Sequence, residues 1–175
     1  TRIVAIATET AASLFSMGSY AGSSRRLDGL TWGAEDLSAD IGAEGNRDRD
    51  GRFTPPFRLA RDLLLFAAGS ARVAAIDTVY VDFRNEAGLR AECAEARRDG
   101  FTAKMAIHPA QVAIINEMFT PDEKAIARAR KIVAAFAANP ALGVVGMSGE
   151  MVDRPHLVRA ERTLARARAA GIDVS

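Results

Sequence analysis

Two acidic side chains follow consecutive short apolar segments of the sequence. Glu9 comes after the run 3–7, and Asp36 comes shortly after the run 29–33. If these runs are neighbouring parallel strands, their ends lie about 4.8 Å apart, and two carboxylates can reach one cation. Mg²⁺ prefers one or two carboxylates completed by water and substrate oxygens. The pair predicts a site for Mg²⁺ or Mn²⁺; the alternative is that each acid caps a following helix.

Four β-rich runs must position these acids. They alternate with helical patterns, an arrangement typical of an α/β fold in which helices cover a parallel sheet. Both an open sheet and a (β/α)₈ barrel fit, but no G-x-G-x-x-G follows the first run, which argues against a dinucleotide-binding fold. The runs are 3–7, 29–33, 73–81 and 101–107, and the predicted helices are 11–20, 56–71, 86–99, 109–118, 121–138 and 155–170, with a loop or short strand at 141–149.

Two of the helical patterns have a clear apolar stripe. The residues expected to face the core are Leu59, Leu63, Phe66 and Ala67 in the first, and Glu86, Leu89, Cys93 and Ala96 in the second.

Several side chains in these runs could have either a catalytic or binding role or a purely structural one. Trp32 and Met105 are expected in the core, and Lys104 points either into a barrel or outward between helices. His108 precedes a proline at a strand end, where a hydrogen-bonded turn residue is more common than a base. His156 is expected to be exposed in a first helical turn.

Composition excludes several classes of protein. The net charge of +1 gives no electrostatic reason to expect nucleic acid, and no apolar run approaches the ~20 residues of a membrane span. The single cysteine, Cys93, fits a reducing compartment, so we expect a cytoplasmic protein. Because the chain opens directly on a strand-like run, we expect its natural N-terminal part to lie outside this sequence.

Six segments in order carry a family pattern, and through them the chain resembles the citrate lyase β-subunit-like proteins of the HpcH/HpaI aldolase superfamily. That group includes lyases for malyl-CoA, citramalyl-CoA and citryl thioesters. The segments are 3–11, 33–42, 51–58, 75–80, 100–111 and 149–153.

The resemblance implies a fold and a site. The fold is a (β/α)₈ TIM barrel, often trimeric, of which 1–138 is the C-terminal half with strands five to eight. The segment 139–175 is then a C-terminal extension that carries Asp153. Glu9 and Asp36 match the metal ligands, with Glu35 and Asp40 as second choices. The family's carboxylate-binding arginine lies on strands absent from this sequence.

The resemblance also implies a reaction: Mg²⁺-dependent making or breaking of a carbon–carbon bond in a hydroxyacyl-CoA thioester, with a glyoxylate- or pyruvate-like acid as the other fragment. Asp153 is the implied acid–base residue, and such chemistry favours a pKa raised by partial burial. The alternative is that Asp153 caps the last helix. The implied assembly is a homo-oligomer, trimer or hexamer.

Three other functions remain open: an aldolase for free 2-oxo acids, a malyl-CoA thioesterase, and a non-catalytic subunit of a lyase complex. CoA and carrier-protein thioesters are not distinguished. The segments 83–85 and 102–104 depart from the family pattern, which leaves substrate preference undetermined.

Overall fold

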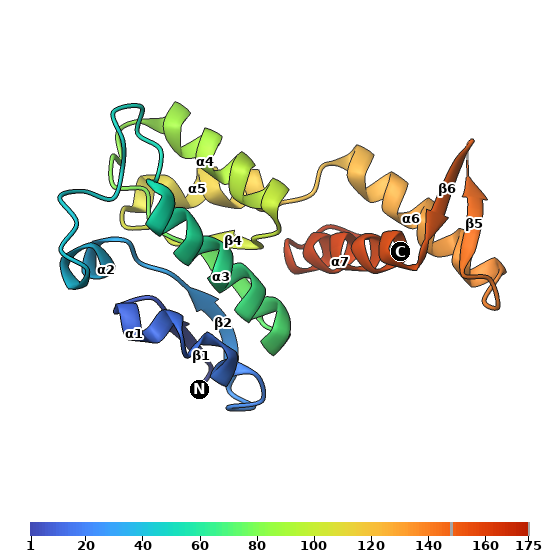
Figure 1. Ribbon diagram of the computed structural model, residues 1–175. Helices are drawn as coiled ribbons and strands as arrows, with labels where there is room; N and C mark the ends of the chain where they lie inside the picture. Colours follow the sequence, from blue (N-terminus) through green and yellow to red (C-terminus); the bar gives the residue numbers. More distant parts are fainter. Residues whose placement is uncertain (148, 175) are drawn as a thin grey trace. The chain divides into compact units, whose positions relative to one another are not determined.

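The computed structural model describes residues 1–147 and 149–174 and divides into two compact units, Thr1–Phe119 and Thr120–Ser175. The first unit is a parallel sheet with strand order β1-β2-β3-β4, so the predicted α/β alternation is confirmed (Figure 1). Its elements are β1 (Ile3–Ile6), α1 (Ala11–Leu14), the 3-10 helix η1 (Met17–Tyr20), β2 (Leu27–Thr31), α2 (Glu35–Asp40), α3 (Pro55–Ala71), β3 (Ala74–Asp77), α4 (Glu86–Asp99), β4 (Ala103–Lys104) and α5 (Pro109–Phe119).

The two faces of this sheet differ in burial. Leu30 pairs with Ala75, and both are buried on the side covered by helices. Val4 and Ile6 project from the opposite face of β1 and are 49% and 51% exposed. Since successive side chains alternate across a strand, each strand contributes to both faces, and only one face has a helical cover in this unit.

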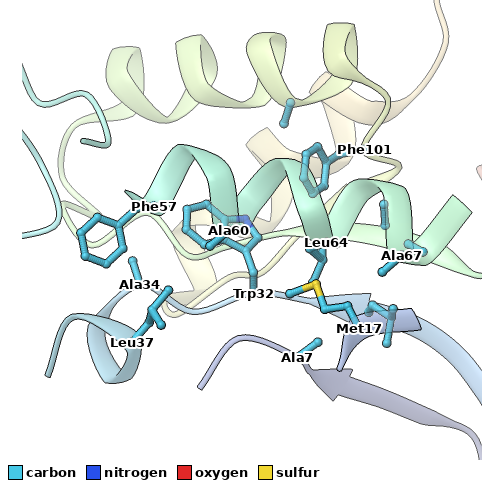
Figure 2. Close-up of a cluster of buried hydrophobic side chains, with 14 of the residues drawn as sticks. Ala7, Met17, Trp32, Ala34, Leu37, Phe57, Ala60, Leu64, Ala67 and Phe101 are labelled. Atoms are coloured by element: carbon cyan, nitrogen blue, oxygen red, sulfur yellow. The ribbon is translucent and has the colours of Figure 1, made fainter. Parts of the chain in front are cut away.

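Helix α3 provides most of that cover. Its buried residues include Phe57, Ala60 and Leu64, and Figure 2 shows them gathered around Trp32. The predicted stripe is confirmed at Ala67, which is buried, and in part at Leu63, but it is wrong at Leu59 and Phe66, which are 57% and 70% exposed. The helix is apolar on more than one side. The buried alanines of α3 face the sheet, and their small side chains let the helix approach the sheet closely.

Helix α4 follows its predicted stripe at three of four positions. Leu89, Cys93 and Ala96 are buried, whereas Glu86 is exposed. Burying a side chain such as Leu89 contributes roughly 1.5–3 kcal/mol. The helix begins at the Asn85 cap, whose side chain accepts a hydrogen bond from the Gly88 amide, and ends at Gly100.

The second unit packs two helices with a β-hairpin. Apolar residues of both helices, including Phe136 and Leu164, share a core with Val145 and Val152 of the hairpin. The predicted helices are confirmed, but the second hairpin strand was missed, and Ser148 of the predicted segment 141–149 lies outside the described residues. The elements are α6 (Glu123–Ala138), β5 (Val144–Met147), β6 (Glu150–Asp153) and α7 (Arg154–Ala169), with β5 and β6 antiparallel.

None of the helices formed by the described residues has both the length and the apolar character needed to cross a bilayer.

Candidate metal and acid site

Glu9 lies just beyond β1, between two anchored threonines. Thr8 is buried; its hydroxyl donates to the Gly33 carbonyl and accepts from the Gly33 amide, both at 2.9 Å. Thr10 is the N-cap of α1 and forms a capping box with Ser13. These bonds fix the backbone on both sides of Glu9, so its carboxylate is presented at the carboxyl end of the sheet.

Asp36 lies in the first turn of the six-residue helix α2, after β2. The N-cap of that helix is Ala34, with no side-chain hydrogen bond, so the alternative of Asp36 as a capping residue is wrong. Within the described part of the chain, the carboxylates of Asp36 and Glu9 each lack a hydrogen-bond or salt-bridge partner.

Both acids line one pocket of about 180 Å³, which also includes Trp32, Arg47 and Phe53. Gly33 makes room for the Glu9 carboxylate, since a Cβ atom at that position would lie 3.1 Å from Glu9 Oε1. A volume below the ~300–1,000 Å³ typical of drug-sized ligands suits a small acid.

The two second-choice acids already have structural partners. Glu35 accepts a hydrogen bond from Asn46 Nδ2 at 2.9 Å, and Asp40 accepts one from the Ala11 amide at 2.7 Å. Asp40 thereby ties the end of α2 to the start of α1. Neither carboxylate is as available as those of Glu9 and Asp36.

The donor set fits a hard cation held by few protein ligands. Over residues 1–147 and 149–174, no cluster of three or more His, Cys, Asp or Glu side chains is arranged to hold a metal. Two carboxylates completed by water and substrate oxygens are what Mg²⁺ accepts, whereas structural zinc normally takes four protein ligands.

A buried charge network supports the wall of this pocket. Asp77 accepts from Trp32 Nε1 at 2.8 Å and pairs with Lys104 Nζ at 2.9 Å. Lys104 also contacts Glu92 at 3.1 Å, and Arg61 Nε lies 3.4 Å from Asp77. Lys104 therefore points outward between sheet and helices, which sequence alone left open. The network itself was not predicted.

Asp153 ends β6 and is the N-cap of α7, so the capping alternative describes its structural role. Its side chain accepts from the His156 amide and contacts the His156 imidazole, which makes His156 a capping partner rather than a free surface residue. The hydrogen bond with His156 lowers the pKa of Asp153. The raised pKa expected for this aspartate is therefore wrong; its catalytic role stays a prediction.

The remaining candidates have structural environments. His108 accepts a hydrogen bond from the Ala110 amide and stacks on Phe83, which confirms a turn residue. Trp32 is 1% exposed and belongs to the core as predicted, although its ring also lines the pocket. Met105 is half-buried and lines the same pocket, so it is not simply core.

A larger hollow lies beside α3 and α4, but most of its charged side chains form ion pairs with one another. Arg58 and Glu95 approach to 2.5 Å, and that hydrogen bond raises the pKa of Arg58. Paired groups of both signs do not select one ligand, so the smaller pocket is the better candidate.

Residues 1–109 match the family model for HpcH/HpaI aldolase/citrate lyase, and residues 58–172 match a model for a carbon–carbon bond lyase of the TIM-barrel fold. The chain is 40% identical over 151 residues to the citrate lyase subunit beta of Escherichia coli, covering 85% of this chain and 48% of that protein. It is 38% identical to the mitochondrial citramalyl-CoA lyase of Rattus norvegicus over 143 residues, covering 81% and 41%.

A third relative, the (3S)-malyl-CoA thioesterase of Cereibacter sphaeroides, is 38% identical over 146 residues, covering 82% of this chain and 50% of that protein. Among solved structures, the protein CitE from Mycobacterium tuberculosis, in complex with magnesium, acetoacetate and coenzyme A, aligns with a TM-score of 0.76 and 33% identity, covering 91% of this chain and 58% of that chain. The chain spans about half the length of the curated relatives it matches. The fold is of the TIM-barrel lyase type.

Proposed function

The chain belongs to the HpcH/HpaI aldolase/citrate lyase family, and we propose that it is the cation-binding part of a Mg²⁺-dependent carbon–carbon lyase or synthase for hydroxyacyl-CoA thioesters. The observation that carries this proposal is the pair Glu9 and Asp36, two carboxylates that line one pocket and have no partner among the described residues. Both side chains are exposed and solvated, so each carboxylate can accept a cation without first breaking a contact within the protein.

The same proposal includes the architecture. The chain would supply strands five to eight of the barrel and the extension that carries Asp153. One observation favours this: Val4 and Ile6 are about half-exposed on the uncovered face of the sheet. Barrel strands direct such residues into a packed interior, so they would be covered in a closed barrel.

Each residue then has a distinct task. Glu9 and Asp36 would hold Mg²⁺, which acts as a Lewis acid toward the oxo group of a small 2-oxo acid. Asp153 would take a proton from the acyl methyl group as its base; the lowered pKa leaves it ionised, as a base must be, but makes it a weaker base. That carbon then bonds to the carbonyl carbon of the acid, and the former oxo oxygen takes up a proton to become the product hydroxyl. In cleavage the hydroxyl gives up its proton, the carbon–carbon bond breaks and the acyl carbon regains a proton.

The direct test mixes acetyl-CoA or propionyl-CoA with glyoxylate or pyruvate in the presence of Mg²⁺. We expect a hydroxyacyl-CoA product, and no product with EDTA. Product formation from free pyruvate alone would support the aldolase instead. No Mg²⁺-dependent product from any pair, with metal binding unaffected by changes at Glu9 and Asp36, would support the scaffold subunit.

A second candidate is thioester hydrolysis, favoured by the similarity to a (3S)-malyl-CoA thioesterase. Here water, rather than the acyl carbon, would be the group activated in the same pocket. Malyl-CoA distinguishes the two reactions: the lyase releases acetyl-CoA and glyoxylate, whereas the thioesterase releases malate and CoA. We further propose a cytoplasmic homo-oligomer, trimer or hexamer, on the family resemblance alone.

A further inference from the structure

The acid pocket contains one basic side chain, Arg47, among the described residues that line it. Its charged neighbours there are the acids Glu9, Glu35 and Asp36. Three carboxylates repel an anionic ligand, so a bound cation or a basic side chain favours the binding of an acid in this pocket. Arg47 lies on the segment between α2 and α3, where an isolated antiparallel bridge joins it to Phe53.

The guanidinium of Arg47 is anchored through only one of its nitrogens. Nη1 donates to Glu92 Oε1 at 2.5 Å and to the Gly51 carbonyl at 2.6 Å. The guanidinium carbon lies 3.8 Å from the centre of the Phe53 ring. Over residues 1–147 and 149–174, the Nε and Nη2 atoms of Arg47 have no hydrogen-bond acceptor. These two atoms form one edge of the fork that matches both oxygens of a carboxylate.

Glu92, which anchors Arg47, is in turn fixed by buried charged residues. Glu92 pairs with Lys104, and Lys104 pairs with Asp77; the Lys104 and Asp77 side chains are 0% and 4% exposed. Trp32 donates to Asp77 and packs edge-on against Phe53 at 4.8 Å, which closes a ring of contacts back to Arg47. A guanidinium held this way loses little conformational entropy when a ligand binds.

We propose that Arg47 binds the carboxylate of the small acid substrate through Nε and Nη2. This inference rests on the proposed function, because it takes the pocket to be the acid-binding site. It adds a carboxylate-binding residue contributed by this half of the molecule. The pocket volume of about 180 Å³ suits a small acid rather than a nucleotide.

The test is calorimetric titration of the protein with pyruvate in saturating Mg²⁺. Arg47→Gln is expected to weaken pyruvate binding about 10- to 100-fold, the range for charge-assisted hydrogen bonds. Arg47→Lys keeps the charge without the fork and is expected to lose less. The matched control is Arg49→Gln, which removes the same charge from an exposed position on the same segment that lines neither this pocket nor the larger hollow.

Titration with Mg²⁺ alone separates this inference from the proposed function. If Arg47→Gln binds Mg²⁺ like the unaltered protein but binds pyruvate weakly, the inference holds. Unchanged pyruvate affinity, an equal loss in Arg49→Gln, or no pyruvate binding by the unaltered protein each overturns it. If pyruvate binding depends on Arg47 while Mg²⁺ binding is absent, the proposed function fails and this inference stands. Should Arg47→Gln not fold, Arg47→Lys decides.

Discussion

The two units place their candidate acids in different structural situations. In Thr1–Phe119, buried ionic groups such as Asp77 and Lys104 pair with one another, and Glu9 and Asp36 at the strand ends have no protein partner. In Thr120–Ser175, Asp153 is itself part of the structure as the N-cap of α7. Glu9 and Asp36 are thus free for a ligand, whereas Asp153 at a helix cap combines a structural role with any catalytic one.

The change Asp153→Asn tests this combination most severely. Asparagine caps helices about as well as aspartate but cannot accept a proton as a base. We expect kcat for the condensation to fall by about 10²- to 10⁴-fold, the range for general acid–base catalysis, while Mg²⁺ affinity and thermal unfolding stay close to those of the unaltered protein. A fall in Tm with unchanged kcat would leave Asp153 with the capping role only.

The change Lys104→Met tests the buried pairing in the first unit. It leaves Asp77 and Glu92 without their shared cation, and removing one partner of a buried pair typically costs about 3–5 kcal/mol. Urea unfolding followed by the fluorescence of Trp32, the only tryptophan, measures this loss in the first unit. The contrasting change in the second unit is Arg128→Gln, which breaks an exposed pair with Glu150 and should matter little. Similar losses of unfolding free energy in Lys104→Met and Arg128→Gln would contradict this difference between the buried and the exposed ion pair.

How far these assignments were predictable depends on what each residue contacts. Glu9 and Asp36 could be selected from sequence because strand ends in parallel sheets converge, and the resemblance specified which acids to choose. The ring through Arg47, Glu92, Lys104 and Asp77 was not predictable, because it joins residues 12 to 45 positions apart through the packing of side chains.

The errors also have physical reasons. The stripe predicted for α3 included Leu59 and Phe66 because spacing alone cannot tell which side of a broadly apolar helix meets the sheet. The pKa direction of Asp153 was wrong because the partner His156 was taken as a surface residue. The spacing of an acid three positions before His156 at a helix start was the available signal, since it places both in a capping box.

Cys93 gives a pH test of the packed layer in the first unit. Burial raises the pKa of its thiol from 9.0 to about 11. A raised folded-state pKa contributes stability that is fully present below the unfolded-state pKa and is lost as the pH rises through 11. Between pH 8 and 11, the unaltered protein should lose about 2 kcal/mol more than Cys93→Ala in urea unfolding. Parallel pH profiles for the two proteins would contradict this.

The smallest expected effect is that of Gly33→Ala. The added Cβ atom would lie 3.1 Å from Glu9 Oε1 and would displace the carboxylate by a few tenths of an ångström. We expect roughly a tenfold loss of Mg²⁺ affinity, as for altered support of a metal ligand, with little change in unfolding. Gly18→Ala is the control, because a Cβ atom there meets nothing within 4 Å. Equal Mg²⁺ affinity in both variants would show that the Glu9 position is not critical.

The most direct test of the account is a Mg²⁺ titration by calorimetry of Glu9→Gln, Asp36→Asn and Glu35→Gln. Glu35 lines the same pocket and carries the same charge, but its carboxylate already bonds Asn46, which makes it the matched control. We predict that the first two changes each weaken Mg²⁺ binding by at least about tenfold, while the third has little effect. Binding that survives both Glu9→Gln and Asp36→Asn, or that falls equally in Glu35→Gln, would contradict the assigned metal site.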